Sequence, residues 1–231
     1  MYACKMTSNF DKLYIALKFR LKGMEFYDAL RALELAKDIH DGFRKDGKTP
    51  EFQHQLEIAL YIMTLKDVQD LEGSIICALL HDTDEDYPHL LSIGVLMAFG
   101  EPRMLAIHML NKHRHDNYDQ YFSSLAGNML ASLVKGVDRI NNFQSMNRGK
   151  FTISKQIKYA DEVVVYFLPM LKKARKNFPK QMDAYYNIEN MLKSQHELIM
   201  LFIGAMQEKE FDEQKSILSE SNEDNLIPLQ Y

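Results

Sequence analysis

Residues 25–42, EFYDALRALELAKDIHDG, carry apolar side chains at the spacing of one face of an α-helix. The residues that share this face are Phe26, Leu30, Leu33 and Ala36. Charged residues fill the opposite face, as in a helix that buries one side against other helices. Alternating, strand-like segments are hard to find, and glycine (10) and proline (6) are scarce. We therefore predict an all-α fold, a single bundle of about eight to ten helices.

The same periodicity continues on both sides of this stretch. Further helices are expected over residues 52–65, 68–82, 88–99, 101–112, 119–140, 153–176 and 180–207. Loops are expected at 43–52, which contains Asp46-Gly47 and Pro50, and at 148–151. We assign residues 1–207 to one domain and expect 208–231 to be an acidic, irregular and loosely attached tail.

Composition narrows the functional classes. A length of 231 residues suits one domain, and 46% hydrophobic residues allow a sizeable core. The net charge of −4 argues against a nucleic-acid binder, although a local basic patch is enough for a small phosphorylated ligand. No apolar run is long enough to cross a membrane. Cys4 and Cys77 form neither a disulfide framework nor a CxxC site, and no apolar leader is visible, so we expect a cytoplasmic protein.

Residues 77–86, CALLHDTDED, carry the chemistry. An apolar helix runs directly into five acidic or imidazole groups: His81, Asp82, Asp84, Glu85 and Asp86. Carboxylates at a helix C-terminus face the negative end of its dipole, and burying them is costly unless a charge compensates. A divalent cation is the usual compensator, and this donor set suits Mn²⁺, Fe²⁺, Zn²⁺ or Mg²⁺. The alternative is a solvated acidic helix end.

Further metal ligands must come from elsewhere in the chain. His54 begins the apolar-periodic segment HQLEIALYIM, where it is either a ligand or an ordinary helix-start residue. Asp138 lies late in a helical segment, either as a ligand or as an ion-pair partner of Lys135 or Arg139 on a solvated face. Taken together, the four candidate ligands are more specific than any one of them: His54, His81, Asp82 and Asp138.

The order of these motifs resembles the HD phosphohydrolase superfamily. Within it, the chain looks like the hydrolase domains of RelA/SpoT-type enzymes and the small alarmone hydrolases. Their pattern is an Arg-Lys loop before the first histidine, an apolar helix ending in HDxxED, and a later K-x-x-D-R-x-x-N segment. The chain supplies Arg44-Lys45, then ALLHDTDED at 78–86, then KGVDRINN at 135–142. Glu162-Val163, followed by Tyr166 and Pro169, is similar to a further family helix.

The resemblance implies an HD-domain helical bundle with one metal ion, usually manganese, on the four candidate ligands. It also implies removal of the 3′-pyrophosphate from guanosine tetra- or pentaphosphate, so the partner would be a small nucleotide. The chain departs from the family pattern at four places. The loop before His54 is one residue longer than in the long bacterial enzymes, and the family's Leu-Ala-Asp-Arg core reads Gly136-Val137-Asp138-Arg139. Gln55 stands where proline usually follows the first histidine, and Asn141-Asn142 replaces the family's His-Asn pair.

Two carboxylates are candidates for proton transfer. Glu85 lies four residues after His81 and shares its face if the helix continues, so we assign it as the main general acid/base. Asp86 is assigned as its helper. The alternative for either residue is that it merely caps the next helical turn.

Four residues are expected to contact the substrate by resemblance: Arg44, Lys45, Asn142 and Ser145. The first two would hold the base and phosphates, since arginine stacks on a purine, and the last two would lie near the sugar and phosphate. Their alternative is ordinary solvated surface. The basic run Lys112-His113-Arg114-His115 either attracts polyphosphate or is an exposed loop.

Three functions therefore remain open at the level of the sequence. The leading prediction is a metal-dependent pyrophosphohydrolase acting on guanosine tetra- or pentaphosphate. A second keeps the site but makes the chain a phosphatase or phosphodiesterase for another nucleotide. A third is a non-catalytic, nucleotide-sensing HD module, which would have little need of Glu85 and Asp86. The sequence leaves the oligomeric state open.

Overall fold

The described part of the chain is helical. The computed structural model describes residues 9–44, 47–90, 92–146 and 151–223, with backbone alone for 209–223. Within these ranges extended backbone pairs at one bridge, between Phe43 and Pro50, and no strand forms. The predicted all-α fold is confirmed. No helix in these ranges is both long and apolar enough to span a bilayer.

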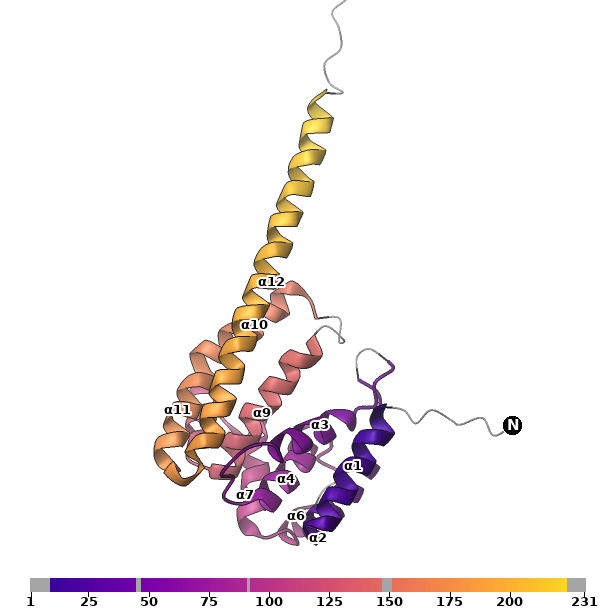
Figure 1. The fold of residues 1–231 in the computed structure, drawn as a ribbon, viewed down its shortest axis with the longest axis vertical. Helices are drawn as coiled ribbons and strands as arrows, with labels where there is room; N and C mark the ends of the chain where they lie inside the picture. Colours follow the sequence, from indigo (N-terminus) through magenta and orange to yellow (C-terminus); the bar gives the residue numbers. More distant parts are fainter. Residues whose placement is uncertain (1–8, 45–46, 91, 147–150, 224–231) are drawn as a thin grey trace, which may run out of the picture.

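The helices form one bundle from which the last helix projects (Figure 1). The first half contains α1 (Asn9–Gly23), α2 (Tyr27–Ile39), α3 (Gln53–Ile62), α4 (Leu71–Leu80), α5 (Thr83–Asp86), α6 (Ile93–Met97) and α7 (Glu101–Leu110). The second half contains the 3₁₀ turn η1 (Lys112–Arg114), α8 (Tyr118–Ala126), α9 (Met129–Ser145), α10 (Ile153–Glu162), the π turn η3 (Val163–Phe167), α11 (Leu168–Asn177), the 3₁₀ turn η4 (Pro179–Gln181) and α12 (Met182–Glu223). With α5 counted as the end of α4, and α10–η3–α11 as one path, the described residues hold ten helices.

Helix α4 is the centre of the bundle. Its sequence LEGSIICALL is apolar on all sides, and every residue from 73 to 80 is buried. The side chain of Asp70 caps its start by accepting a 2.8 Å hydrogen bond from Gly73 N, an interaction typically worth about 1 kcal/mol. α4 packs against α2, α3, α7 and α9, and α3 also packs against α9. Three helices that carry candidate ligands are therefore mutual neighbours.

Two predicted helices have different limits in the structure. The helix expected over 119–140 is two helices, α8 and α9, because Asn128 breaks the path and caps α9 by accepting from Ala131 N at 2.9 Å. The helix expected over 88–99 begins only at Ile93, after the cap at Ser92. The sequence analysis also missed α1.

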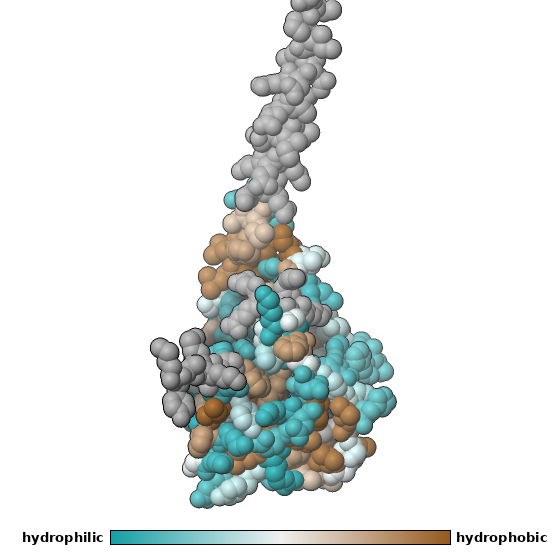
Figure 2. All heavy atoms as spheres, turned by 90° about the vertical axis from the view of Figure 1, so that its right-hand side faces the viewer, coloured by the Kyte–Doolittle hydropathy of each residue, from teal (hydrophilic) through white to brown (hydrophobic). Residues whose placement is uncertain are grey.

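Helix α12 extends far beyond the bundle. It was expected to end near residue 207, with an irregular tail from 208, but its backbone stays helical to Glu223. Residues 208–223 contain five glutamates and two lysines, which favour helix, and neither glycine nor proline. Where α12 leaves the bundle, hydrophobic side chains gather at the surface (Figure 2), and Leu198, Leu201 and Phe202 are exposed there. The division into a domain and a loosely attached tail stays a prediction.

Candidate metal centre

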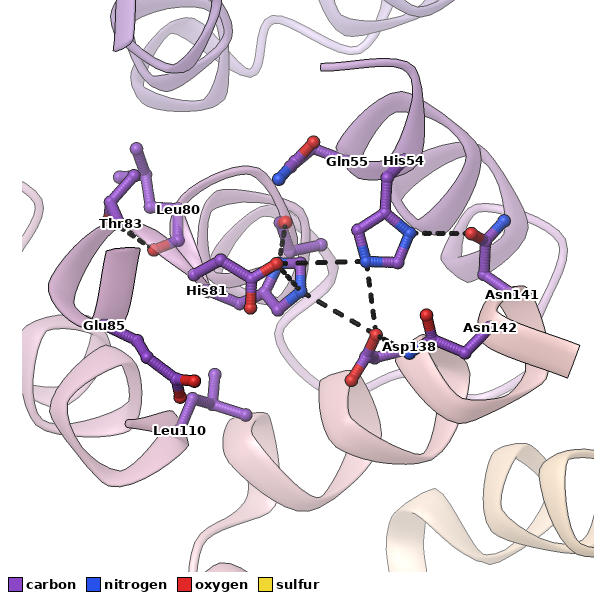
Figure 3. Close-up of polar contacts among 12 residues, drawn as sticks. His54, Gln55, Leu80, His81, Thr83, Glu85, Leu110, Asp138, Asn141 and Asn142 are labelled. Atoms are coloured by element: carbon purple, nitrogen blue, oxygen red, sulfur yellow. Dashed lines mark hydrogen bonds and ion pairs between the residues drawn. The ribbon is translucent and has the colours of Figure 1, made fainter. Parts of the chain in front are cut away.

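Three neighbouring helices bring four side chains to one point (Figure 3). His54 lies in the first turn of α3, His81 and Asp82 directly follow α4, and Asp138 lies in α9. Ligand atoms of His54, His81 and Asp138 all lie within 4.8 Å of one another. Asp82 Oδ2 lies 2.9 Å from His81 Nε2 and 3.9 Å from His54 Nε2. The structure thus places all four predicted ligands together.

The end of α4 explains how two adjacent residues reach one centre. The α-helix ends at Leu80, and Thr83 Oγ1 donates a 2.5 Å hydrogen bond to the Leu80 carbonyl, which fixes the turn into α5. His81 is almost fully buried and Asp82 is half-buried, so their side chains lie between the two helical segments. A cation beyond the end of α4 can therefore contact both.

A hydrogen-bond chain fixes the ring of His54. Asn141 Nδ2 donates to the carboxylate of Glu57 at 2.7 Å, so Asn141 Oδ1 faces His54 Nδ1, also at 2.7 Å. An amide oxygen only accepts, and the proton of His54 therefore lies on Nδ1. His54 Nε2 then presents a lone pair 3.2 Å from Asp138 Oδ1.

The ring of His81 is fixed in the same sense. His81 Nδ1 donates to the carbonyl of Ala78 at 2.8 Å, because a carbonyl cannot donate. Its Nε2 then faces Asp82 Oδ2 at 2.9 Å and Asp138 Oδ1 at 3.9 Å. Two imidazole lone pairs and two carboxylates thus meet in a largely buried space. Such a set requires protons or a cation, and the donors fit a divalent metal with imidazole and carboxylate ligands.

The carboxylates hold positive charge at this centre. Burial disfavours the imidazolium of His81, but Asp82 and Asp138 outweigh it and raise the pKa of His81 to about 9. Burial raises the pKa of Asp82, and the pairing with His81 outweighs this and lowers it to about 2. Burial also opposes ionisation of Asp138, yet the ammonium of Lys135 holds the pKa of Asp138 well below its usual range. Without a metal ion, the centre therefore holds its positive charge as a proton on His81.

Asp138 is oriented on both of its oxygens. Asn142 Nδ2 donates to Oδ1 at 2.7 Å, and Lys135 Nζ pairs with Oδ2 at 3.0 Å. The ion pair with Lys135, which was the alternative role for Asp138, is therefore present. However, Asp138 is only 5% exposed, so it does not lie on a solvated face. Arg139 pairs instead with Glu162 at 2.6 Å.

A cavity of about 390 Å³ opens beside the centre. Its wall includes three of the four candidate ligands, His54, Asp82 and Asp138. Both candidate acid/base residues also line it. Burial raises the pKa of Asp86, and the negative charges of Asp82 and Glu85 raise it further. Opposite charge comes from cavity-lining basic side chains: Arg44, Lys112, Lys135 and Lys155. A phosphorylated ligand in this cavity would meet both cationic groups and proton acceptors.

The predicted substrate residues have different positions. Arg44 lies at the cavity, on a loop held by the hydrogen bond from its backbone N–H to Thr49 O at 2.8 Å. Asn142 and Ser145 line the cavity too, but Asn142 also orients Asp138, as described above. Lys45 lies outside the described residues.

Sequence reasoning missed several groups at this site. Lys135 and Asn141 flank Asp138 at i−3 and i+3, a spacing that indicates a shared helix face, yet they were considered only as an ion-pair partner and as a family departure. Lys112 was one member of a basic run with no assigned contact. Phe151 and Tyr159, whose rings lie 5.6 Å apart, line the cavity and carried no local signal.

Comparison with known proteins adds no assignment. No protein-family model matches the chain, and no curated protein matches its sequence.

Proposed function

We propose that the chain is a metal-dependent phosphohydrolase that removes the 3′-pyrophosphate from guanosine tetra- or pentaphosphate. One observation carries the proposal: two histidine Nε2 lone pairs and two carboxylates converge beside a cavity that also holds Glu85, Asp86 and several cationic side chains. The nucleotide itself rests on the sequence resemblance. The manganese ion rests on the same resemblance, and the donor set also suits neighbouring divalent metals.

The chain's own residues support hydrolysis by position and charge. His54, His81, Asp82 and Asp138 would hold the ion, which when bound lowers the pKa of a water and neutralises phosphate charge. Glu85 and Asp86 would accept the proton of the attacking water. Lys112 and Lys135 line the same cavity, where their ammonium groups would hold phosphate oxygens in line for attack.

One observation keeps a second substrate class in view. Asn141 stands at the position of the family's histidine, and its Oδ1 lies 2.7 Å from His54 Nδ1, so this position supports a candidate metal ligand. Gln55, in place of the usual proline, is buried and lines the cavity. Both changes alter the pocket without removing a metal ligand. They favour a phosphatase or phosphodiesterase for another nucleotide as the alternative.

The test is a product assay with purified protein, Mn²⁺ and a nucleotide panel. The panel contains guanosine tetraphosphate, nucleoside monophosphates and cyclic nucleotides, and the released pyrophosphate and orthophosphate are measured separately. We expect pyrophosphate from the tetraphosphate. Orthophosphate from monophosphates alone would exclude the alarmone substrate.

A variant tests the assigned acid/base. Glu85→Gln is expected to lower kcat by about 10²- to 10⁴-fold with Mn²⁺ still bound, because the amide cannot accept the proton. Glu189→Gln is the matched control, since Glu189 pairs with Arg175 at 3.0 Å on α12 rather than at the cavity. Full activity of Glu85→Gln with metal bound would show that another residue transfers the proton. If the wild-type protein neither binds metal nor hydrolyses any nucleotide of the panel, the non-catalytic, nucleotide-sensing module would be the remaining proposal.

A further inference from the structure

In the sequence, Asp84 lies between the candidate ligand Asp82 and the two candidate acid/base residues, Glu85 and Asp86. Its carboxylate is buried. Arg114 holds both of its oxygens, with Nε 2.5 Å from Oδ2 and Nη2 2.8 Å from Oδ1. Asn111 Nδ2 donates to Oδ2 and to the backbone carbonyl of Asp84, both at 2.9 Å. His108 Nδ1 lies 3.3 Å from Oδ2. Three side chains from α7 and the following turn thus converge on this one carboxylate.

The groups that Asp84 binds belong to the segment that reaches the candidate catalytic carboxylate. Asn111 Oδ1 also accepts from His113 N at 2.9 Å and so caps the turn η1. On the other side of this turn, Lys112 N lies 3.4 Å from Glu85 Oε2, and Lys112 Nζ forms an ion pair with Glu85 Oε1. Residues 111–114 are therefore fastened to Asp84 and to Glu85 at the same time.

The two ends of this arrangement lie in different surroundings. Among the described residues, Lys112 and Glu85 line the cavity, whereas Asp84, Asn111 and Arg114 do not. The Asp84 side chain is 8% exposed, while that of Arg114 is 50% exposed. Side chains of Arg114, Asn111 and His108 surround this carboxylate within 3.3 Å. A buried, ionised carboxylate with this many donors is a strong anchor for a turn.

We propose that Asp84 is a positioning residue that anchors segment 111–114 through Arg114 and Asn111, so that Lys112 holds Glu85 in place and presents its ammonium to the phosphate in the cavity. The catalytic consequence rests on the proposed function. Asp84 would touch neither substrate nor metal, and its whole effect on turnover would pass through Lys112. A residue whose role is only to stabilise the fold would act independently of Lys112.

A double-variant cycle separates these roles. Asp84→Asn removes the bidentate ion pair and is expected to lower kcat/KM by about 10- to 100-fold, because catalytic groups tolerate little displacement. Lys112→Met removes the group through which Asp84 acts. In the Lys112→Met background, Asp84→Asn is expected to have no further effect beyond about twofold. Glu189→Gln, which also breaks a partly buried carboxylate–arginine pair, is the control and is expected to keep wild-type kcat/KM.

Hydrogen exchange tests the anchor without turnover. Asp84→Asn is expected to speed amide exchange at residues 111–115, where His113 N and Lys112 N now bond to side chains, and Glu189→Gln is expected to leave these amides unchanged. The proposal would be overturned if the losses of kcat/KM from Asp84→Asn and Lys112→Met multiplied in the double variant. Unchanged amide exchange at residues 111–115 in Asp84→Asn would also overturn it. Absence of hydrolysis by the wild-type protein would overturn the proposed function alone, since the exchange measurement still decides the anchor.

Discussion

The ring of His81 binds either a proton or a metal ion through Nε2, because its Nδ1 is committed to Ala78 O. Without metal, the raised pKa of about 9 means that protonated His81 stabilises the fold. This contribution is complete below the unfolded value of about 6.5 and is lost as the pH rises through about 9. We expect the free energy of unfolding of chelated protein to fall between about pH 6.5 and 8.5, measured by urea denaturation.

Metal reverses the sign of this pH dependence. Mn²⁺ displaces the proton from His81, so stabilisation by a fixed excess of Mn²⁺ should grow as the pH rises over the same range. His81→Gln should abolish both effects, while the same substitution at exposed His89 should leave them intact. A chelated wild-type protein whose stability is flat over this range would contradict the assigned tautomer and charge.

Asn141 is expected to control metal affinity without touching the metal. Asn141→Ala removes the acceptor that keeps the His54 proton on Nδ1, so the Mn²⁺ dissociation constant should rise by about 10- to 100-fold in calorimetric titration. Asn187→Ala is the control, since Asn187 accepts one hydrogen bond from Tyr61 at 3.1 Å on an exposed helix face. Equal affinities of the two variants would argue against His54 as a ligand.

Residue types and their order predicted which groups would gather, but not which bonds each would make. The four residue types taken together, His54, His81, Asp82 and Asp138, with the family resemblance, led to the prediction of a shared centre. The sequence could not show that Asn142, expected near the sugar, donates to Asp138 at 2.7 Å. Nor could it pair Lys112 with Glu85, because residues 27 positions apart meet only through the packing of α7 on α4 and α9. Tertiary contacts of this kind leave no periodic signal.

At the scale of elements, helix α9 positions Asp138 through a close approach at Gly136. A Cβ atom there would lie 2.8 Å from Ile188 Cγ2 and 3.1 Å from Leu171 Cδ2, so α9 packs directly on α12 and α11. Gly136→Val is expected to lower the free energy of unfolding by about 1–3 kcal/mol through overpacking. It should also weaken Mn²⁺ binding, because Asp138 lies two residues further along the same helix.

Gly204 offers the same substitution without the clash. A Cβ atom at Gly204 meets nothing within 4 Å among the described residues, so Gly204→Val should change the free energy of unfolding by less than about 0.5 kcal/mol. Urea denaturation of both variants makes the comparison. Equal stabilities would mean that the α9–α12 contact can open without cost.

Helix existence was easier to predict than helix limits. Periodicity identified α2, α3, α4 and α7 nearly to their ends, because each buries one stripe or all of its surface. It ran through the α8–α9 break, since Gly127 and Asn128 interrupt the helix without interrupting the apolar pattern. It also stopped at 207 in α12, because the sequence of 208–223 carries few apolar residues and no regular apolar stripe to detect.

At the scale of the whole molecule, the candidate site lies where α3, α4 and α9 meet, while α12 ends far from it (Figure 1). α12 supports the site only through its packed part, which contacts α9, α10 and α11. The buried residues of that part are Ala184, Tyr185, Ile188, Leu192 and Ile203. Ile203 is the last buried residue among the side chains that the structure describes, and it comes four residues before the predicted domain limit at 207.

Removing residues 208–231 should therefore leave the bundle intact. We expect the free energy of unfolding to change by less than about 0.5 kcal/mol and Mn²⁺ affinity to stay at the wild-type value, because the truncated chain keeps every α12 residue that the structure describes as buried, the last being Ile203. A chain that ends at residue 197 is the control. It loses buried Ile203 and partly buried Ile199, so it should lose several kcal/mol, about 2–5 for each fully buried isoleucine side chain. If the shorter truncation alone already weakened metal binding, the projecting part of α12 would have to act on the site, and the single-domain division at 207 would be wrong.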